Sequence, residues 1–212
     1  VVGGDRLDIT VRLDAKSHAL ITMPGASKFY RSSGPQARLH QHFYLDEGST
    51  LEWLPQDTII FPGANAALRS VFHLKASSTL LAWELYCLGR PVIGETFSHG
   101  TLESRLEVWV EDEPRLIERQ HLGDGDLTPV AGHPWIGTLL FYPANEEHLD
   151  TVRALLAPLG HFAGATLTDE LLSVRFLSHD NLICQRVMRD IWQSLRPLLT
   201  TKTACSPRIW QT

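Results

Sequence analysis

Apolar and polar residues alternate along most of the first two thirds of the chain. Leu7, Ile9, Val11 and Leu13 share one face of such a segment, while charged and hydroxyl side chains fill the other face. A period of two is typical of β-strands with one buried face. The same alternation recurs in residues 37–45, 67–74, 79–88, 105–110, 114–122 and 135–142. Turns rich in proline, glycine and Asx residues separate these segments, which predicts a mainly β fold built from layered or stacked sheets.

The last third changes to a helical period. Apolar residues recur at helical spacing over 149–156, after an acidic start at Glu146 and before Pro158. A longer apolar stripe runs from Asp180 to Pro197, with Ser178 or Asp180 as its N-cap and Pro197 as its end. We expect these two α-helices in the C-terminal third, with a strand over 170–177 between them. A stripe as continuous as the second is typical of a core helix.

Composition indicates an ordinary globular protein. The chain has 212 residues, of which 43% are hydrophobic and 20% charged, which excludes disorder and is enough for one core. We expect one domain over 1–212. Because the chain begins at Val1 in what looks like the middle of a structure, we also expect that it lacks an N-terminal segment.

Charge and hydropathy limit which classes of partner and which cellular location we expect. The net charge of −5 gives no basic field for a phosphate backbone, so nucleic acid is not an expected partner. No run of 18 apolar residues and no signal peptide are present, so we expect no membrane segment and a cytoplasmic protein. Cys87, Cys184 and Cys205 have no C-x-x-C spacing, which favours reduced thiols over a disulfide or zinc site.

Common enzymatic motifs are missing from the sequence. It contains no phosphate-binding loop, no dinucleotide-binding glycine pattern, no G-x-S-x-G elbow and no H-E-x-x-H pair. Catalysis is therefore unsupported by motif.

Two histidines form the best local metal pair. His40 and His42 lie two residues apart in a predicted strand, so their side chains project from the same face and suit one metal ion. The alternative is a pair of solvated histidines on a strand face.

Two carboxylates interrupt apolar strands. Glu84 lies inside a segment apolar enough to be buried on both faces, and Glu118 is a weaker case. A buried carboxylate persists only if it is paired, hydrogen-bonded, protonated or beside a watered cavity or ion path. The alternatives are a buried pair of Glu84 with an arginine such as Arg90, and a solvated edge position for Glu118.

Several longer stretches together resemble one family, the urease accessory proteins UreD, called UreH in some organisms. The resemblance covers essentially the whole chain. It is carried by Val2-Gly3-Gly4-Asp5, by residues 20–32, 51–57 and 61–64, by Leu88-Gly89-Arg90-Pro91-Val92-Ile93-Gly94-Glu95, by 105–109, by the second helix and by Pro207-Arg208-Ile209-Trp210. This sequence departs from the family pattern in one respect. The family carries a β-rich segment before the Gly-Gly-Asp motif, and we expect that segment to be missing here.

The resemblance implies a β-rich, non-enzymatic scaffold with two helices. Such a scaffold joins UreF and the GTPase UreG to the urease apoprotein, so that Ni²⁺ reaches the urease active site. It implies no tightly bound cofactor, only Ni²⁺ in transit through an internal polar tunnel. Ser27, Glu84 and Glu118 match family positions associated with that path.

Two other functions remain open from the sequence. One is a β-rich hydrolase that uses Glu84 and Glu118 as a carboxylate pair, which requires the two groups in an open cleft. The other is a storage or sensor protein that holds nickel tightly through His40 and His42.

Overall fold

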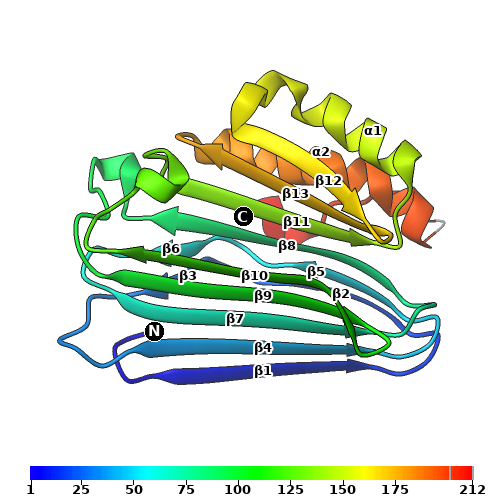
Figure 1. Ribbon diagram of the computed structural model, residues 1–212, viewed down its shortest axis with the longest axis horizontal. Helices are drawn as coiled ribbons and strands as arrows, with labels where there is room; N and C mark the ends of the chain where they lie inside the picture. Colours follow the sequence, from blue (N-terminus) through cyan, green and yellow to red (C-terminus); the bar gives the residue numbers. More distant parts are fainter. Residues whose placement is uncertain (201, 212) are drawn as a thin grey trace.

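The chain winds into stacked coils whose strands form two facing β-sheets (Figure 1). This computed structural model describes residues 1–200 and 202–211. Sheet A has five strands in the order β1 (Arg6–Leu13), β4 (Ala37–Leu45), β7 (Asn65–Leu74), β9 (Thr101–Val110) and β10 (Glu113–Gly123). The first four strands are parallel and in register, so equivalent positions of successive coils stack directly.

Sheet B faces sheet A and carries the remaining strands. Its main order is β12 (Ala163–Thr168), β13 (Leu171–Ser178), β11 (Trp135–Tyr142), β8 (Thr79–Leu88), β5 (Thr50–Leu54) and β2 (His18–Thr22). Two short strands, β3 (Ser27–Phe29) and β6 (Thr58–Ile60), pair with each other, and β6 also pairs with β8. Four 3₁₀ segments complete the described elements: η1 (Pro91–Ile93), η2 (Thr128–Val130), η3 (Ala157–Phe162) and η4 (Arg208–Gln211).

Two helices cover the outer face of sheet B. The helix α2 (Asn181–Thr200) buries its apolar stripe against β8, β11 and β13, and α1 (Glu146–Leu156) packs against β12 and α2. The outer face of sheet A carries no helix in the described part of the chain (Figure 1). The α1 N-cap is Asn145, whose side chain accepts a hydrogen bond from the His148 backbone N–H. No helix within residues 1–200 or 202–211 is both long and apolar enough to span a bilayer.

Glu52 fastens α2 to sheet B. This carboxylate on β5 is fully buried and accepts hydrogen bonds from Trp192 Nε1 at 2.7 Å and Arg196 Nε at 3.0 Å. His18 Nε2 lies 2.9 Å from its other oxygen. A buried charge needs such partners, so this cluster ties the position of the helix to one strand of the sheet.

The predicted fold class is confirmed, and the strands are found at or within a few residues of the predicted ranges. The sequence analysis was wrong about the end of the second helix. Pro197 lies inside α2, which continues to Thr200, because a proline this near the end removes only one backbone hydrogen bond. Asp180 does cap the helix, since its Oδ1 accepts from Leu182 N at 2.7 Å. The analysis also missed β2, β3, β5, β6 and β12, which are short.

Candidate functional site

A polar layer crosses the interior between the two sheets. Gln41, Ser70, Glu84 and Thr138 each lie at the middle of a strand and point between the sheets. The residues two positions away on either side are apolar, except that the Tyr86 hydroxyl also reaches the layer. Gln41 pairs in register with Ser70 in sheet A, and Glu84 pairs with Thr138 in sheet B. The layer separates two apolar clusters, one built around Phe43, Phe72 and Leu80 and one built around Leu39, Leu68 and Leu88.

Glu84 is the centre of this layer. Ser70 Oγ donates a hydrogen bond of 2.5 Å to Glu84 Oε1, and Tyr86 Oη donates one of 2.6 Å to Oε2. Ser70 Oγ also lies 3.2 Å from Gln41 Oε1. Burial raises the pKa of Glu84, against the opposing effect of the two hydroxyl donors. Burial and the neighbouring carboxylate raise the pKa of Tyr86 well above its ordinary value, so the phenol stays protonated and donates.

A cavity of about 260 Å³ reaches Glu84 from the side of β3. Its lining includes Ser27, Gln41, Ser70, Glu84 and Tyr86. Glu84 therefore keeps some accessible surface although it lies deep between the sheets. The volume is sufficient for several water molecules, since one occupies about 30 Å³ in the liquid.

Glu118 lies beyond the end of this cavity. It is on β10, the edge strand of sheet A, and its side chain points inward toward Arg175 on β13 of sheet B. Arg175 Nε donates to both carboxylate oxygens at 3.1 Å, and the Arg175 terminal nitrogen also contacts Oε2. Both side chains are about one third to two fifths exposed, at 33% and 41%. This ion pair spans the two sheets at the side of the molecule opposite Ser27.

The register relates Glu84 to the ion pair. In sheet B, Glu84, Thr138 and Arg175 occupy one cross-strand row on β8, β11 and β13. In sheet A, Ser70 and Glu118 occupy the matching row, with Leu106 between them. Two strand spacings separate Glu84 from Arg175, or about 10 Å. Glu84 and Glu118 thus lie in matching rows of the two sheets, whereas Ser27 is in register with Thr58 and Tyr86, one row away, and shares the cavity with Glu84.

The structure decides between the alternatives for these two carboxylates. Glu84 is not paired with Arg90, because the Arg90 guanidinium binds Glu95 across a tight turn next to η1. Glu84 is instead hydrogen-bonded and beside a cavity. Glu118 does lie on an edge strand, but it is paired rather than simply solvated.

His40 and His42 do share the outer face of β4, as their spacing predicts. His40 Nδ1 lies 3.6 Å from Asp8 Oδ1, and burial lowers the pKa of His40. Within the described residues, no group of three or more His, Cys, Asp or Glu side chains is arranged to hold a metal ion.

Sequence reasoning missed the partners of the carboxylates, which are Ser70, Tyr86 and Arg175, and the strand neighbour Thr138. The sequence did contain a signal that could have identified the polar layer. In the triplets Leu39-x-Gln41-x-Phe43, Leu68-x-Ser70-x-Phe72 and Ile136-x-Thr138-x-Leu140, a polar residue interrupts the apolar face at mid-strand. Single interruptions of this kind are common, but the same interruption in several stacked strands predicts a shared polar layer.

The fold and its interior define a class: a β-solenoid with helices on one side and a polar layer through its core. The chain belongs to the UreD urease accessory protein family, whose sequence pattern matches residues 1–211. Members of this family are accessory proteins and not enzymes, which removes the carboxylate hydrolase from consideration.

Individual relatives agree with this assignment. A urease accessory protein UreD of Enterobacter sp. (strain 638) is 74% identical over the whole chain, which covers 77% of that relative. The UreD of Klebsiella aerogenes is 66% identical over the whole chain, which covers 78% of it. The UreD of Pseudomonas putida (strain GB-1) is 53% identical, with the whole chain covering 76% of it.

Proposed function

We propose that this protein is a urease maturation scaffold that links UreF and the GTPase UreG to the urease apoprotein and passes Ni²⁺ along its internal polar layer. The observation that carries the proposal is the cavity lined by Ser27 and Glu84 inside an otherwise apolar solenoid. An interior needed only for stability gains nothing from a carboxylate held there without a cation.

The ligands in the layer suit transport better than storage. Carboxylate and hydroxyl oxygens bind Ni²⁺ more weakly than imidazole or thiolate groups, so an ion that reaches Glu84 is able to leave. A cation entering this interior loses water, and the negative charge of Glu84 offsets part of that cost. Ni²⁺ also favours the ionised carboxylate, so its arrival is expected to release the proton that burial tends to retain.

The second stage of the path runs from Glu84 to Glu118. Thr138 lies between them in sheet B and offers a hydroxyl, whereas Leu106 opposite offers none. The Arg175 guanidinium is already bound to the Glu118 carboxylate, so an arriving cation has to displace it. This competition makes the Glu118 end a controlled exit, opened only when the cation is present or a partner moves Arg175.

An experiment can test the nickel-conduit role separately from the scaffold role. We would express the urease operon with Glu84→Gln, with Glu118→Gln and with both substitutions, then measure the nickel content and activity of the purified urease. Glutamine keeps the shape of each side chain and removes its charge. Glu103→Gln is the matched control, because Glu103 lies on β9 of sheet A and its side chain is exposed on the outer face.

The expected result is a loss of at least half of the urease nickel in the double variant, with Glu103→Gln unchanged. Size exclusion with light scattering should show that the double variant still forms the complex with UreF. Full nickel content in the double variant rejects the conduit and leaves the scaffold intact. A well-folded chain that elutes alone in the presence of UreF rejects the scaffold itself.

A further inference from the structure

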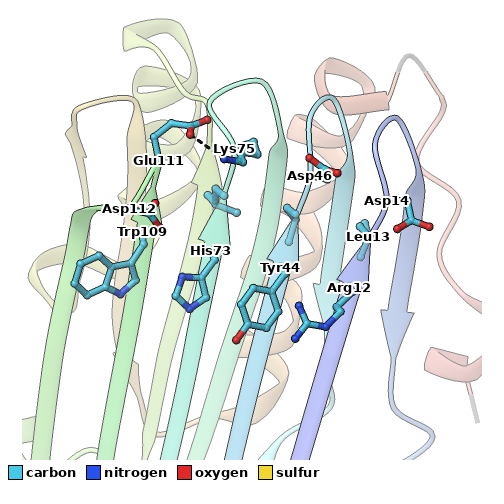
Figure 2. Close-up of a pocket in the computed structure, with 12 residues that line it drawn as sticks. Arg12, Leu13, Asp14, Tyr44, Asp46, His73, Lys75, Trp109, Glu111 and Asp112 are labelled. Carbon is cyan, nitrogen blue, oxygen red and sulfur yellow. Dashed lines mark hydrogen bonds and ion pairs between the residues drawn. The ribbon is translucent and has the colours of Figure 1, made fainter.

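A row of ring-bearing and cationic side chains lies on the outer face of sheet A, far from the polar layer. Arg12, Tyr44, His73 and Trp109 pair in register across β1, β4, β7 and β9. Figure 2 shows them side by side on one surface, just before the turns that end these strands. We call these four residues the aromatic shelf. They line an open groove of about 520 Å³.

The shelf is ordered by its own contacts. The Tyr44 and His73 rings stack with centroids 4.9 Å apart and planes within 5° of parallel. The Arg12 guanidinium carbon lies 4.1 Å from the centre of the Tyr44 ring. Trp109 is oriented by a hydrogen bond of 3.2 Å from its Nε1 to Glu107. With neighbouring strands about 4.8 Å apart, the row is about 15 Å long. Within it, Arg12 covers one face of the Tyr44 ring and His73 covers the other.

Carboxylates surround the shelf where the strands turn. Asp14, Asp46, Glu111 and Asp112 all line the groove, against only two cations, Arg12 and Lys75. Lys75 is already paired with Glu111 at 3.1 Å, and Figure 2 shows this contact. Burial lowers the pKa of His73, so its imidazole is neutral near pH 7 and adds no positive charge. The groove therefore carries net negative charge beside the aromatic side chains that line it.

We propose that the aromatic shelf is a docking surface for an arginine-bearing segment of a partner protein. A guanidinium stacks flat on aromatic rings and at the same time donates hydrogen bonds in its plane. The shelf offers both contacts, because the Trp109 ring lines the groove and carboxylates lie at the adjacent turns. Arg12 over Tyr44 is an example of this stacking within the chain itself.

The charge of the groove argues against other occupants. An acidic segment would be repelled by the turns. A second copy of this chain bound face to face would bring the same four carboxylates against themselves, which is unfavourable for a symmetric interface. The groove at the aromatic shelf thus fits a basic partner.

A labelled hexapeptide of alternating glycine and arginine is the first probe. Its binding to the full chain would be followed by fluorescence anisotropy, beside hexapeptides with lysine, glutamine or glutamate in place of arginine. We expect the order arginine, then lysine, then glutamine, with no binding of the glutamate peptide. The variants are Trp109→Ala, Trp109→Phe and Asp46→Asn with Asp112→Asn, and the control is Glu103→Gln on the same outer face.

Trp109→Ala should weaken binding of the arginine peptide about tenfold, and Trp109→Phe should restore part of it, as expected for a ring contact. The double asparagine variant should weaken binding and reduce its dependence on salt. Equal binding by Trp109→Ala and the parent overturns the proposal, as does equal binding of the glutamine and arginine peptides. Sedimentation is the last check, because a self-association abolished by Trp109→Ala would assign the shelf to a second copy.

Discussion

Ser70 on β7 donates a 2.5 Å hydrogen bond to the Glu84 carboxylate on β8, and the two strands belong to opposite sheets. The contact joins the sheets at their centre, where the interior on either side is apolar. The solenoid therefore carries an internal ionisable group fixed by both of its walls.

Glu84→Gln should stabilise the protein near pH 8. Burial raises the pKa of Glu84 in the folded state, so folding favours the protonated form. The stability from that form is complete below the unfolded pKa of about 4.3 and is lost as the pH rises through the folded pKa. Glutamine is neutral throughout and avoids this loss. Urea unfolding should show a gain on the order of 1 kcal/mol at pH 8, shrinking toward pH 5.

The control for this prediction is Glu103→Gln, which removes an exposed carboxylate from the same domain. Its urea midpoint should follow that of the parent chain at both pH values. A Glu84→Gln variant that is less stable than the parent at pH 8 would mean that the ionised carboxylate stabilises the fold.

Glu52→Ala should be strongly destabilising. The substitution leaves Arg196 and the Trp192 indole N–H buried without their acceptor, and losing one partner of a buried pair costs about 3–5 kcal/mol. Urea unfolding followed by tryptophan fluorescence measures the change. Glu111→Gln breaks the exposed Lys75 pair instead and should cost far less, because solvent screens that pair. Similar costs for the two variants would contradict the role of Glu52 as the attachment point of α2.

A single cysteine should react in the native protein. Burial raises the pKa of Cys87 and of Cys184 to about 12, so thiolate is scarce at pH 8, whereas Cys205 is exposed. Ellman's reagent at pH 8 should titrate one thiol per folded chain and three after unfolding in urea. Cys205→Ser should abolish the native reaction. Rapid reaction of a second thiol would indicate that the contacts of α2 with sheet B open readily.

His40 and His42 should not form a tight nickel site. Both project from the outer face of β4, but the described residues offer no third ligand with them. Two imidazoles on an open sheet face leave most of the coordination sphere to water. Equilibrium dialysis should give the same nickel binding for the parent and for His40→Ala with His42→Ala. A sub-micromolar site lost in the double variant would support the storage function.

The stacked β fold, the positions of the longer strands and both helices could be predicted from the sequence, because alternation and helical period are local properties. Glu84 was identifiable for the same reason, since a carboxylate inside a long apolar run conflicts with its neighbours. The short strands β2, β3, β5, β6 and β12 had too few residues to show a period. Pro197 was misjudged because its effect depends on how near it lies to the end of α2.

The tertiary structure alone decided which groups meet. Ser70 is 14 residues from Glu84, and Arg175 is 57 residues from Glu118, yet each pair is in contact. The aromatic shelf likewise joins residues from four strands, from Arg12 on β1 to Trp109 on β9, which are far apart in the sequence. Sequence alternation determines which face of a strand is buried, but the register between strands determines which side chains are neighbours. That register depends on turn lengths and on packing across the whole solenoid, which no local pattern records.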